Sequence, residues 1–431
     1  MPPIAFPRWR PFAAVLRAAV ATAAAAVPVA TIAQPSWLPS GLPPLSEEGP
    51  TLCPRDYLTP EQGEALLQAT LAEFSDAAAW QRYASVVRQR IQEGAGLAPW
   101  PRRTPLNAIV RNVREHDGYS VANVAIETVP GVWAAGNLFR PLGHEGPHAA
   151  ILSTHGHTRG IDGPEGYDRH GRFGPWVQTR AAMFARAGAI VLTLDAFGYG
   201  DSIAQFGPDA HRTSTAMRAQ LWNAMRAVDF LSALPDVDAS RIGVTGESGG
   251  GTQAFLLTAV DPRITASAPV VMVSGYFFGG CPCESGRPIH RSKEHFASNA
   301  VIAALAAPRP MLVVSDGADW TQHVPKIEFP FLKEVYRRLG AADRVSNVHL
   351  ADEGHDYGPG KRAAVYPFFG DTLGLDVAAL RGSDGAYDES RVTIEPAAVM
   401  RTFPDEASLP PGALRDPAEV DRVLDQLQGD G

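Results

Sequence analysis

The chain has 431 residues, 45% of them hydrophobic, and a formal net charge of −8 from 38 basic and 46 acidic side chains. This length and apolar content suffice for one large buried core. An acidic balance without a basic tract argues against nucleic acid or an anionic membrane surface as a partner. Three cysteines, Cys53, Cys281 and Cys283, cannot form a disulfide framework and allow one pair with a free thiol.

Residues 1–33 have the pattern of a secretory signal peptide. Arg8, Arg10 and Arg17 precede or interrupt an alanine- and valine-rich run that ends at the small-residue site Thr31-Ile32-Ala33. The run is too short and too rich in alanine for a transmembrane span, and Arg17 argues against the alternative of an uncleaved anchor. We therefore expect an exported mature chain, periplasmic or extracellular, of 431 − 33 = 398 residues.

Residues 34–106 are predicted to hold a linker and an N-terminal helical extension. A stretch rich in Pro, Ser and Gly is followed by Thr59-Pro60-Glu61, which has the residue types of a helix N-cap and first turn. The amphipathic pattern of residues 63–91 predicts two helices with a break near Ser75-Asp76.

Asp117-Gly118 and Pro130-Gly131 then separate β-rich runs, which predicts two successive hairpins.

Residues 107–376 are predicted to form the main domain, in which apolar runs alternate with helical patterns. Strands are expected at residues 149–154, 189–194, 242–245, 268–273, 311–315 and 345–350, and helices at 178–187, 215–234, 252–260, 295–305, 327–339 and 361–373. This alternation indicates an α/β fold with a mostly parallel, doubly wound sheet covered on both faces. Residues 377–431 are polar and Pro-rich, with one short strand at 392–395, and are expected to be a C-terminal extension.

A Gly-x-Ser-x-Gly pattern stands between an expected strand and an expected helix. It consists of Gly246-Glu247-Ser248-Gly249-Gly250. So sharp a turn leaves no room for side chains beside the serine, which explains glycine on both sides. The turn exposes the Ser248 hydroxyl, and it places the Gly249 N–H at a helix N-terminus, where it can meet developing negative charge. We interpret Ser248 as a nucleophile.

A serine nucleophile needs a base, and the base needs a carboxylate to orient it. In open α/β sheets such groups follow the carboxyl ends of strands. Asp319 lies past the turn after the strand at 311–315, with Asp316 as the alternative acid closer to that strand. His355, after the strand at 345–350, is the expected base. The order Ser, Asp, His is that of the α/β-hydrolase fold.

The second oxyanion donor is expected from the loop His155-Gly156-His157, after the strand at 149–154. We assign it to the backbone N–H of His157, together with that of Gly249. A metal site at His155 and His157 is a weaker alternative, because no third ligand stands at an obvious spacing. We expect His155 to be a buried hydrogen-bonding residue and Glu247 to be a structural acceptor. No metal or cofactor is predicted.

Other candidates have plainer interpretations. Trp176, Trp222 and Trp320 could form a sugar-binding floor, although core or rim packing is commoner for tryptophan. The loop with Cys281, Cys283 and Glu284 follows the strand next to the nucleophile strand, so it is expected to line the cleft. A shaped loop or a disulfide to Cys53 is favoured there over a metal site.

Several spaced motifs together resemble one protein family. They are GVTGESGGGTQAFLLTAVDPRI, the HGH turn, DAFGYGDS, PRPMLVVSDGADWT and DEGHDYGPGKR, and the resemblance covers residues 57–376. The chain resembles the exported bacterial α/β-hydrolases described as acetyl xylan esterase-like. The resemblance implies the α/β-hydrolase fold, with Ser248, Asp319 and His355 as nucleophile, acid and base of a carbohydrate-deacylating serine esterase. The chain departs from the G-x-S-R-x-G-K turn associated with glucuronoyl esterases, since Gly249 stands in place of arginine.

The sequence thus predicts a secreted serine carboxylic-ester hydrolase that removes acetyl groups from xylan-type carbohydrate esters through an acyl-enzyme. A glucuronoyl methyl esterase and a peptidase of the prolyl-oligopeptidase type are the alternative enzymes; the 398 residues leave no room for the propeller such peptidases carry. An inactive binding module on the same fold is the non-enzyme alternative. The sequence does not specify the acyl group, the alcohol, the oligomeric state, the disulfide pairing or the role of the C-terminal extension.

Overall fold

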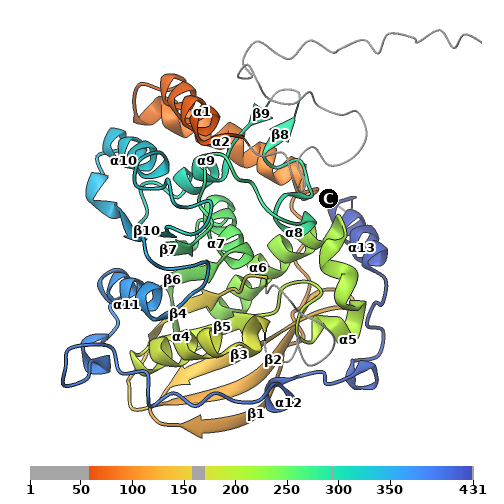
Figure 1. The fold of residues 1–431 in the computed structure, drawn as a ribbon. Helices are drawn as coiled ribbons and strands as arrows, with labels where there is room; N and C mark the ends of the chain where they lie inside the picture. The colour runs from red at the N-terminus through yellow and green to blue at the C-terminus, as the bar shows by residue number, and fades with distance from the viewer. Residues whose placement is uncertain (1–57, 158–169, 293–294, 430–431) are drawn as a thin grey trace, which may run out of the picture.

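The structure is a computed structural model that describes residues 58–157, 170–292 and 295–429. Within these residues the centre of the molecule is a nine-stranded sheet of order β1-β2-β3-β5-β4-β6-β7-β10-β11 (Figure 1). Its strands are β1 (Ile109–His116), β2 (Tyr119–Val129), β3 (Val132–Pro141), β4 (His148–Ser153), β5 (Ile190–Leu194), β6 (Val237–Glu247), β7 (Ile264–Val270), β10 (Met311–Asp316) and β11 (Val345–Leu350). A separate two-stranded sheet pairs β8 (Arg291–Ser292) with β9 (His295–Phe296).

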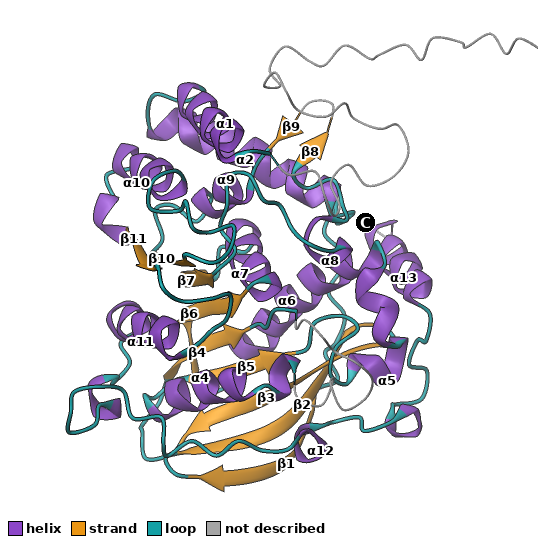
Figure 2. Cartoon of the chain, in the orientation of Figure 1, coloured by secondary structure: helices purple, strands orange, loops and turns teal. Residues whose placement is uncertain are grey.

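Helices and loops surround this sheet (Figure 2). The helices are α1 (Pro60–Ala72), α2 (Ala77–Gly94), α4 (Pro175–Arg186), α5 (Ser202–Phe206), α6 (Thr215–Ala233), α7 (Gly249–Val260), α8 (Pro282–Ser285), α9 (Asn299–Ala304), α10 (Glu328–Arg338), α11 (Pro359–Leu373), α12 (Ala397–Met400) and α13 (Pro417–Gly429). The two N-terminal helices begin where side chains satisfy the first backbone donors. Thr59 and Gln62 form a reciprocal capping box, and Asp76 accepts from the Ala79 N–H at 2.9 Å.

The parallel half of the sheet is buried on both faces. Ile151 and Val191 belong to a buried hydrophobic cluster that also contains residues of α4 and α11, whereas their neighbours Leu152 and Leu192 belong to a second cluster that contains residues of α6, α7 and α10. Figure 1 shows these two groups of helices on opposite sides of the sheet. Successive side chains of a strand point to opposite faces, so a strand buried on both sides must be apolar at nearly every position. The fold is therefore the expected α/β-hydrolase arrangement, with a doubly wound and mostly parallel sheet.

The antiparallel edge of the sheet is built from the two predicted hairpins. Gly118 and Gly131 occupy the turns between β1, β2 and β3 with φ of 82° and 81°, a region in which only glycine is unstrained. β3 then pairs antiparallel with β5, which joins the hairpins to the parallel half.

The chain after α11 is fixed to the sheet by buried charges. The Arg172 guanidinium is fully buried, and it donates to the Met400 carbonyl at 2.9 Å and to Asp195 at 2.7 Å. The same guanidinium pairs at 3.0 Å with Asp201, which accepts the backbone N–H of Phe403 at 3.0 Å. Removing one partner from such a network leaves an uncompensated buried charge, so these contacts stabilise the position of the C-terminal segment.

Most predicted elements are present, and the differences concern five of them. The strand expected at 392–395 is absent, because that segment bonds through side chains, such as Glu395 with Arg114 at 2.9 Å, rather than through a ladder. The helix expected at 295–305 is shorter, since its first residues form β9. β7 begins and ends earlier in the chain than the expected 268–273, and α7 begins at Gly249 rather than at 252. α13 was not predicted.

The predicted signal peptide, the linker up to residue 57 and Cys53 lie outside the described residues. Among the residues that are described, no helix combines the length and the apolar character needed to cross a membrane.

One buried carboxyl makes the stability of the fold depend on pH. Burial raises the pKa of Glu328 to about 7, although the carboxyl accepts the Gly275 N–H at 2.7 Å. The folded state therefore binds a proton more tightly than the unfolded state does, and stability falls as the pH rises from about 4.5 to 7. Above that window, the ionised Glu328 carboxylate lowers the free energy of unfolding by on the order of 3 kcal/mol.

We expect Glu328→Gln to be more stable than wild type at pH 8 and close to it at pH 5, because an amide keeps an acceptor for Gly275 and carries no charge. Urea unfolding at both pH values measures this difference. Glu64→Gln, at an exposed position of α1, is the control and should give no pH-dependent change. Equal effects of Glu328→Gln at pH 5 and pH 8 would show that Glu328 does not titrate in this window.

Candidate active site

Ser248 stands alone between β6 and α7, in a turn that forces its backbone into an unusual conformation. Its φ is 55° and its ψ is −123°, in a region that non-glycine residues rarely adopt outside functional sites. A Cβ on Gly246 would lie 2.3 Å from Thr154 Oγ1, and one on Gly250 would lie 2.8 Å from the His155 carbonyl carbon. Both glycines are therefore required by the close approach of the loop after β4.

That loop contains His155, Gly156 and His157, and it runs against the nucleophile. A Cβ on Gly156 would lie 2.7 Å from the Ser248 Cβ. Glu247 fixes this approach, because its Oε1 accepts the Gly156 N–H at 3.3 Å and the Trp176 indole N–H at 3.2 Å. The loop thus lies where a second oxyanion donor is needed, and Glu247 points away from the nucleophile as a structural acceptor.

Asp319 and His355 lie together after neighbouring strands β10 and β11. Asp319 Oδ2 is 2.5 Å from His355 Nδ1, and Asp319 Oδ1 accepts both the N–H and the hydroxyl of Thr321 at 2.5 and 2.6 Å. A carboxylate on Nδ1 fixes the tautomer that leaves Nε2 as the basic nitrogen. Among the described residues, no hydrogen bond joins the Ser248 hydroxyl to His355; in enzymes without substrate such a bond is often long.

Asp316, the alternative acid, is directed into the protein interior. It is fully buried, accepts the Ala318 N–H at 3.0 Å, and lies 3.4 Å from the Lys361 ammonium group. Burial and the charge of Asp319 raise the pKa of Asp316. The geometry therefore favours Asp319 as the partner of His355.

Trp320 forms a wall beside this pair. Its ring stacks on Phe277 with centroids 3.8 Å apart and meets the His355 ring at 4.7 Å. Phe277 therefore covers one face of the Trp320 ring, and Trp320 as a whole is half-buried. Trp222 is buried and donates to the Thr128 carbonyl at 3.0 Å, which makes it a core residue.

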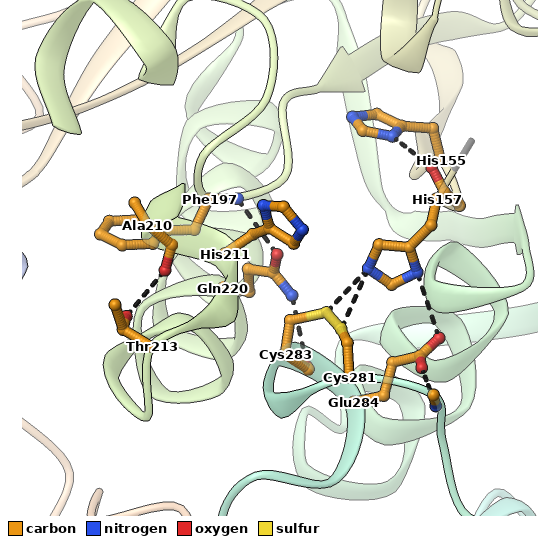
Figure 3. Close-up of a disulfide and its surroundings, with 12 residues drawn as sticks. His155, His157, Phe197, Ala210, His211, Thr213, Gln220, Cys281, Cys283 and Glu284 are labelled. Carbon is orange, nitrogen blue, oxygen red and sulfur yellow. Dashed lines mark hydrogen bonds and ion pairs between the residues drawn. A yellow bond between two sulfur atoms is a disulfide. The ribbon is translucent and has the colours of Figure 1, made fainter. Parts of the chain in front are cut away.

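In the loop after β4, His157 lies between a disulfide and a buried carboxylate (Figure 3). Its Nε2 is 2.8 Å from Cys283 Sγ and 3.2 Å from Cys281 Sγ, and these two cysteines are bonded to each other. Its Nδ1 is 3.5 Å from Glu284 Oε1. Because both sulfur atoms are in the disulfide, neither offers a thiolate to a metal in this state.

The pKa values of the two histidines of the loop shift in opposite directions. Burial lowers the pKa of His155 to about 4; its Nδ1 is 3.0 Å from the Gly156 carbonyl and its Nε2 accepts the Ala196 N–H at 3.1 Å. His155 is therefore a neutral residue that shapes the loop. Burial alone would lower the pKa of His157, but the charge of Glu284 outweighs it and raises that pKa. Burial opposes the ionisation of Glu284, yet His157 and two backbone N–H groups lower its pKa.

Sequence reasoning placed the loop of Cys281, Cys283 and Glu284 at the cleft but did not find its contact with His157. It also missed Tyr199 and His211, whose rings lie 5.9 and 6.0 Å from that of His157. The glycine-rich run that contains Tyr199 was the available signal for one of them.

Comparison with known proteins points to esterases. The family model "Glucuronyl esterase, fungi" matches residues 207–283. Among solved structures, the chain is similar to Methylesterase BT1017, with 39% sequence identity, a TM-score of 0.77, and coverage of 87% of this chain and 82% of that one.

Two curated relatives are more distant. A protein of Bacillus subtilis (strain 168), named as the hydrolase YtaP, is 25% identical over 60% of this chain and 90% of its own length. The 4-O-methyl-glucuronoyl methylesterase 1 of Wolfiporia cocos (strain MD-104) is 26% identical over 38% of this chain, and the match spans 47% of that protein.

The acid can be identified by two matched substitutions. We expect Asp319→Asn to lower kcat about 10⁴-fold, because the amide leaves His355 in the wrong tautomer. Asp316→Asn should keep kcat within about tenfold and should lower the melting temperature instead, since Lys361 loses a buried partner. Rates on a p-nitrophenyl ester and thermal unfolding of both variants provide the test. A crippled Asp316→Asn beside an active Asp319→Asn would reverse the assignment.

Proposed function

We propose that this chain, which belongs to the family of α/β-hydrolase esterases that includes Methylesterase BT1017, is a serine esterase. Its proposed reaction removes methyl groups from esterified uronate residues of carbohydrates. The observation that carries the proposal is its 39% identity to a methylesterase over 87% of this chain. The match of residues 207–283 to a glucuronyl esterase model supports a uronate as the acyl part. Methyl ester cleavage thus takes precedence over the acetyl ester predicted from sequence.

In the proposed mechanism, Ser248 Oγ attacks the ester carbonyl while His355 Nε2 accepts its proton. The hydrogen bond of 2.5 Å between His355 Nδ1 and Asp319 supports this role, because it orients the ring and stabilises the imidazolium. The carbonyl oxygen becomes an oxyanion that the backbone N–H groups of Gly249 and His157 would hold. As the first residue of α7, Gly249 has no acceptor for its N–H within the helix.

Collapse of this intermediate breaks the bond to the methoxy oxygen, and the proton on His355 passes to the leaving group to give methanol. The uronoyl group is then esterified to Ser248. A water molecule, deprotonated by His355, attacks that ester and releases the uronate and the free serine. No cofactor enters the proposed cycle.

We further infer that the enzyme acts outside the cytoplasm on a soluble or polymeric carbohydrate. The pattern of residues 1–33 supports export.

Product analysis distinguishes methyl from acetyl ester hydrolysis. We expect methanol release from a methyl-esterified uronate oligosaccharide to exceed acetate release from an acetylated xylo-oligosaccharide by at least about 100-fold in kcat/KM. Ser248→Ala should abolish both reactions. Faster release of acetate than of methanol would contradict the methyl ester proposal and restore the deacetylase interpretation. Full activity of Ser248→Ala would exclude the serine mechanism.

A further inference from the structure

The residue after the nucleophile has no side chain, and another residue fills its place. A Cβ on Gly249 would lie 2.8 Å from His157 Cε1, 3.0 Å from His157 Nδ1 and 3.1 Å from Glu284 Oε1. The His157 ring therefore lies over the first residue of α7, next to the backbone donor assigned to the oxyanion. Gly249 is glycine because the imidazole and the carboxylate occupy this volume.

The partners of His157 hold its ring in a fixed orientation. The disulfide meets Nε2, and Glu284 faces Nδ1 across 3.5 Å. Glu284 is itself anchored by the Gly280 N–H at 2.5 Å. Because each ring nitrogen already faces a partner, the ring can affect the ester through its charge more readily than by donating a new hydrogen bond.

Burial differs between the two members of this pair. The side chain of Glu284 is 4% exposed, whereas that of His157 is 26% exposed. The Glu284 carboxylate is thus enclosed by the protein, and His157 is the member of the pair that reaches solvent. A buried carboxylate is tolerated where a cation compensates it, so the arrangement favours the protonated form of His157 next to Gly249.

From this geometry we propose that the His157 imidazolium stabilises the negative charge that develops on the ester carbonyl oxygen, from the position that a side chain of residue 249 would otherwise occupy. The proposal rests on the proposed esterase function and adds an electrostatic group to the two backbone donors. The G-x-S-R-x-G-K pattern, which this chain lacks, would place an arginine at position 249. Here the cation comes from the loop after β4 instead.

A charge-rescue experiment tests the proposal. His157→Ala keeps the backbone N–H and removes the ring, so we expect kcat on the methyl ester to fall about 100-fold, the range seen for loss of one oxyanion contact. Adding Gly249→Arg should raise kcat at least about tenfold above that of His157→Ala. The His157 ring no longer fills the space, so the guanidinium can occupy it and pair with Glu284. Adding the neutral Gly249→Gln instead should restore nothing.

The kinetics of these variants distinguish failure of the charge role of His157 from failure of the proposed esterase function. Equal kcat values for the Arg and Gln double variants, or an unchanged kcat in His157→Ala, would overturn the role of the charge and leave His157 as a loop anchor. Failure of wild type to hydrolyse any ester, or full activity of Ser248→Ala, would instead contradict the proposed function. Circular dichroism spectra and melting temperatures verify that the variants fold.

A pH profile gives a second measurement that does not depend on the double variants. The groups facing His157 are Glu284 of α8, His211 of the 3₁₀ segment Pro208–Arg212, His155 of the same loop, and Tyr199 after β5. Glu284→Gln removes the anion that favours the imidazolium, so kcat should begin to fall at a pH at least about one unit lower than in wild type. An unshifted profile would contradict the proposal.

Discussion

The active site depends on how closely two backbone turns approach each other at the carboxyl edge of the sheet. β4 and β6 are neighbours in parallel register, so the chain leaves both strands at the same level and in the same direction. The turn after β6 holds Ser248 with a positive φ, and the turn after β4 passes so near that Gly156, Gly246 and Gly250 have no space for a Cβ. Interiors pack at crystal-like density, so a methyl group at any of these positions would displace the nucleophile, the loop beside it, or both. Steric exclusion thus determines the backbone at this edge, and the charged side chains of the site lie beside these glycine turns.

The candidate active site contains two carboxylate–imidazole pairs, and their surroundings differ. Asp319 holds His355 by a hydrogen bond of 2.5 Å, and the His355 side chain contacts Trp320 but remains 27% exposed, which fits a group that must gain and lose a proton. Glu284 faces His157 at 3.5 Å, and the other ring nitrogen lies against the disulfide, which fits a group that keeps its charge. In the proposed mechanism, His355 would carry a proton, whereas His157 would supply a positive charge beside the oxyanion.

The sequence predicted the features that depend on local patterns. The alternation of strands and helices, the hairpins at Gly118 and Gly131, the capped helix at Thr59 and the helix break near Ser75-Asp76 all follow from periodicity and turn chemistry, and the structure confirms them. The contact of His157 with Glu284 could not be predicted, because it joins loops 127 residues apart whose conformations no pattern encodes. The strand expected at 392–395 failed for a related reason. In place of a ladder, the Glu395 carboxylate accepts from Arg114, and the Glu395 backbone N–H donates to the Gln178 side chain.

Buried charge connects the C-terminal segment to the nucleophile loop. Arg172 lies in the 3₁₀ turn Gly171–Phe173, and a Cβ on Gly171 would lie 3.1 Å from His155 Cε1, so this turn packs directly on the loop beside Ser248. The guanidinium needs acceptors on every side, and the Met400 carbonyl supplies one that the sheet cannot. Without residues near 400, the position of Arg172 would be maintained only by Asp195, Asp201 and Asn137. We therefore infer that the segment after α11 supports the candidate active site, because it completes the hydrogen bonding of the turn that packs on His155, and His155 lies in the same loop as His157.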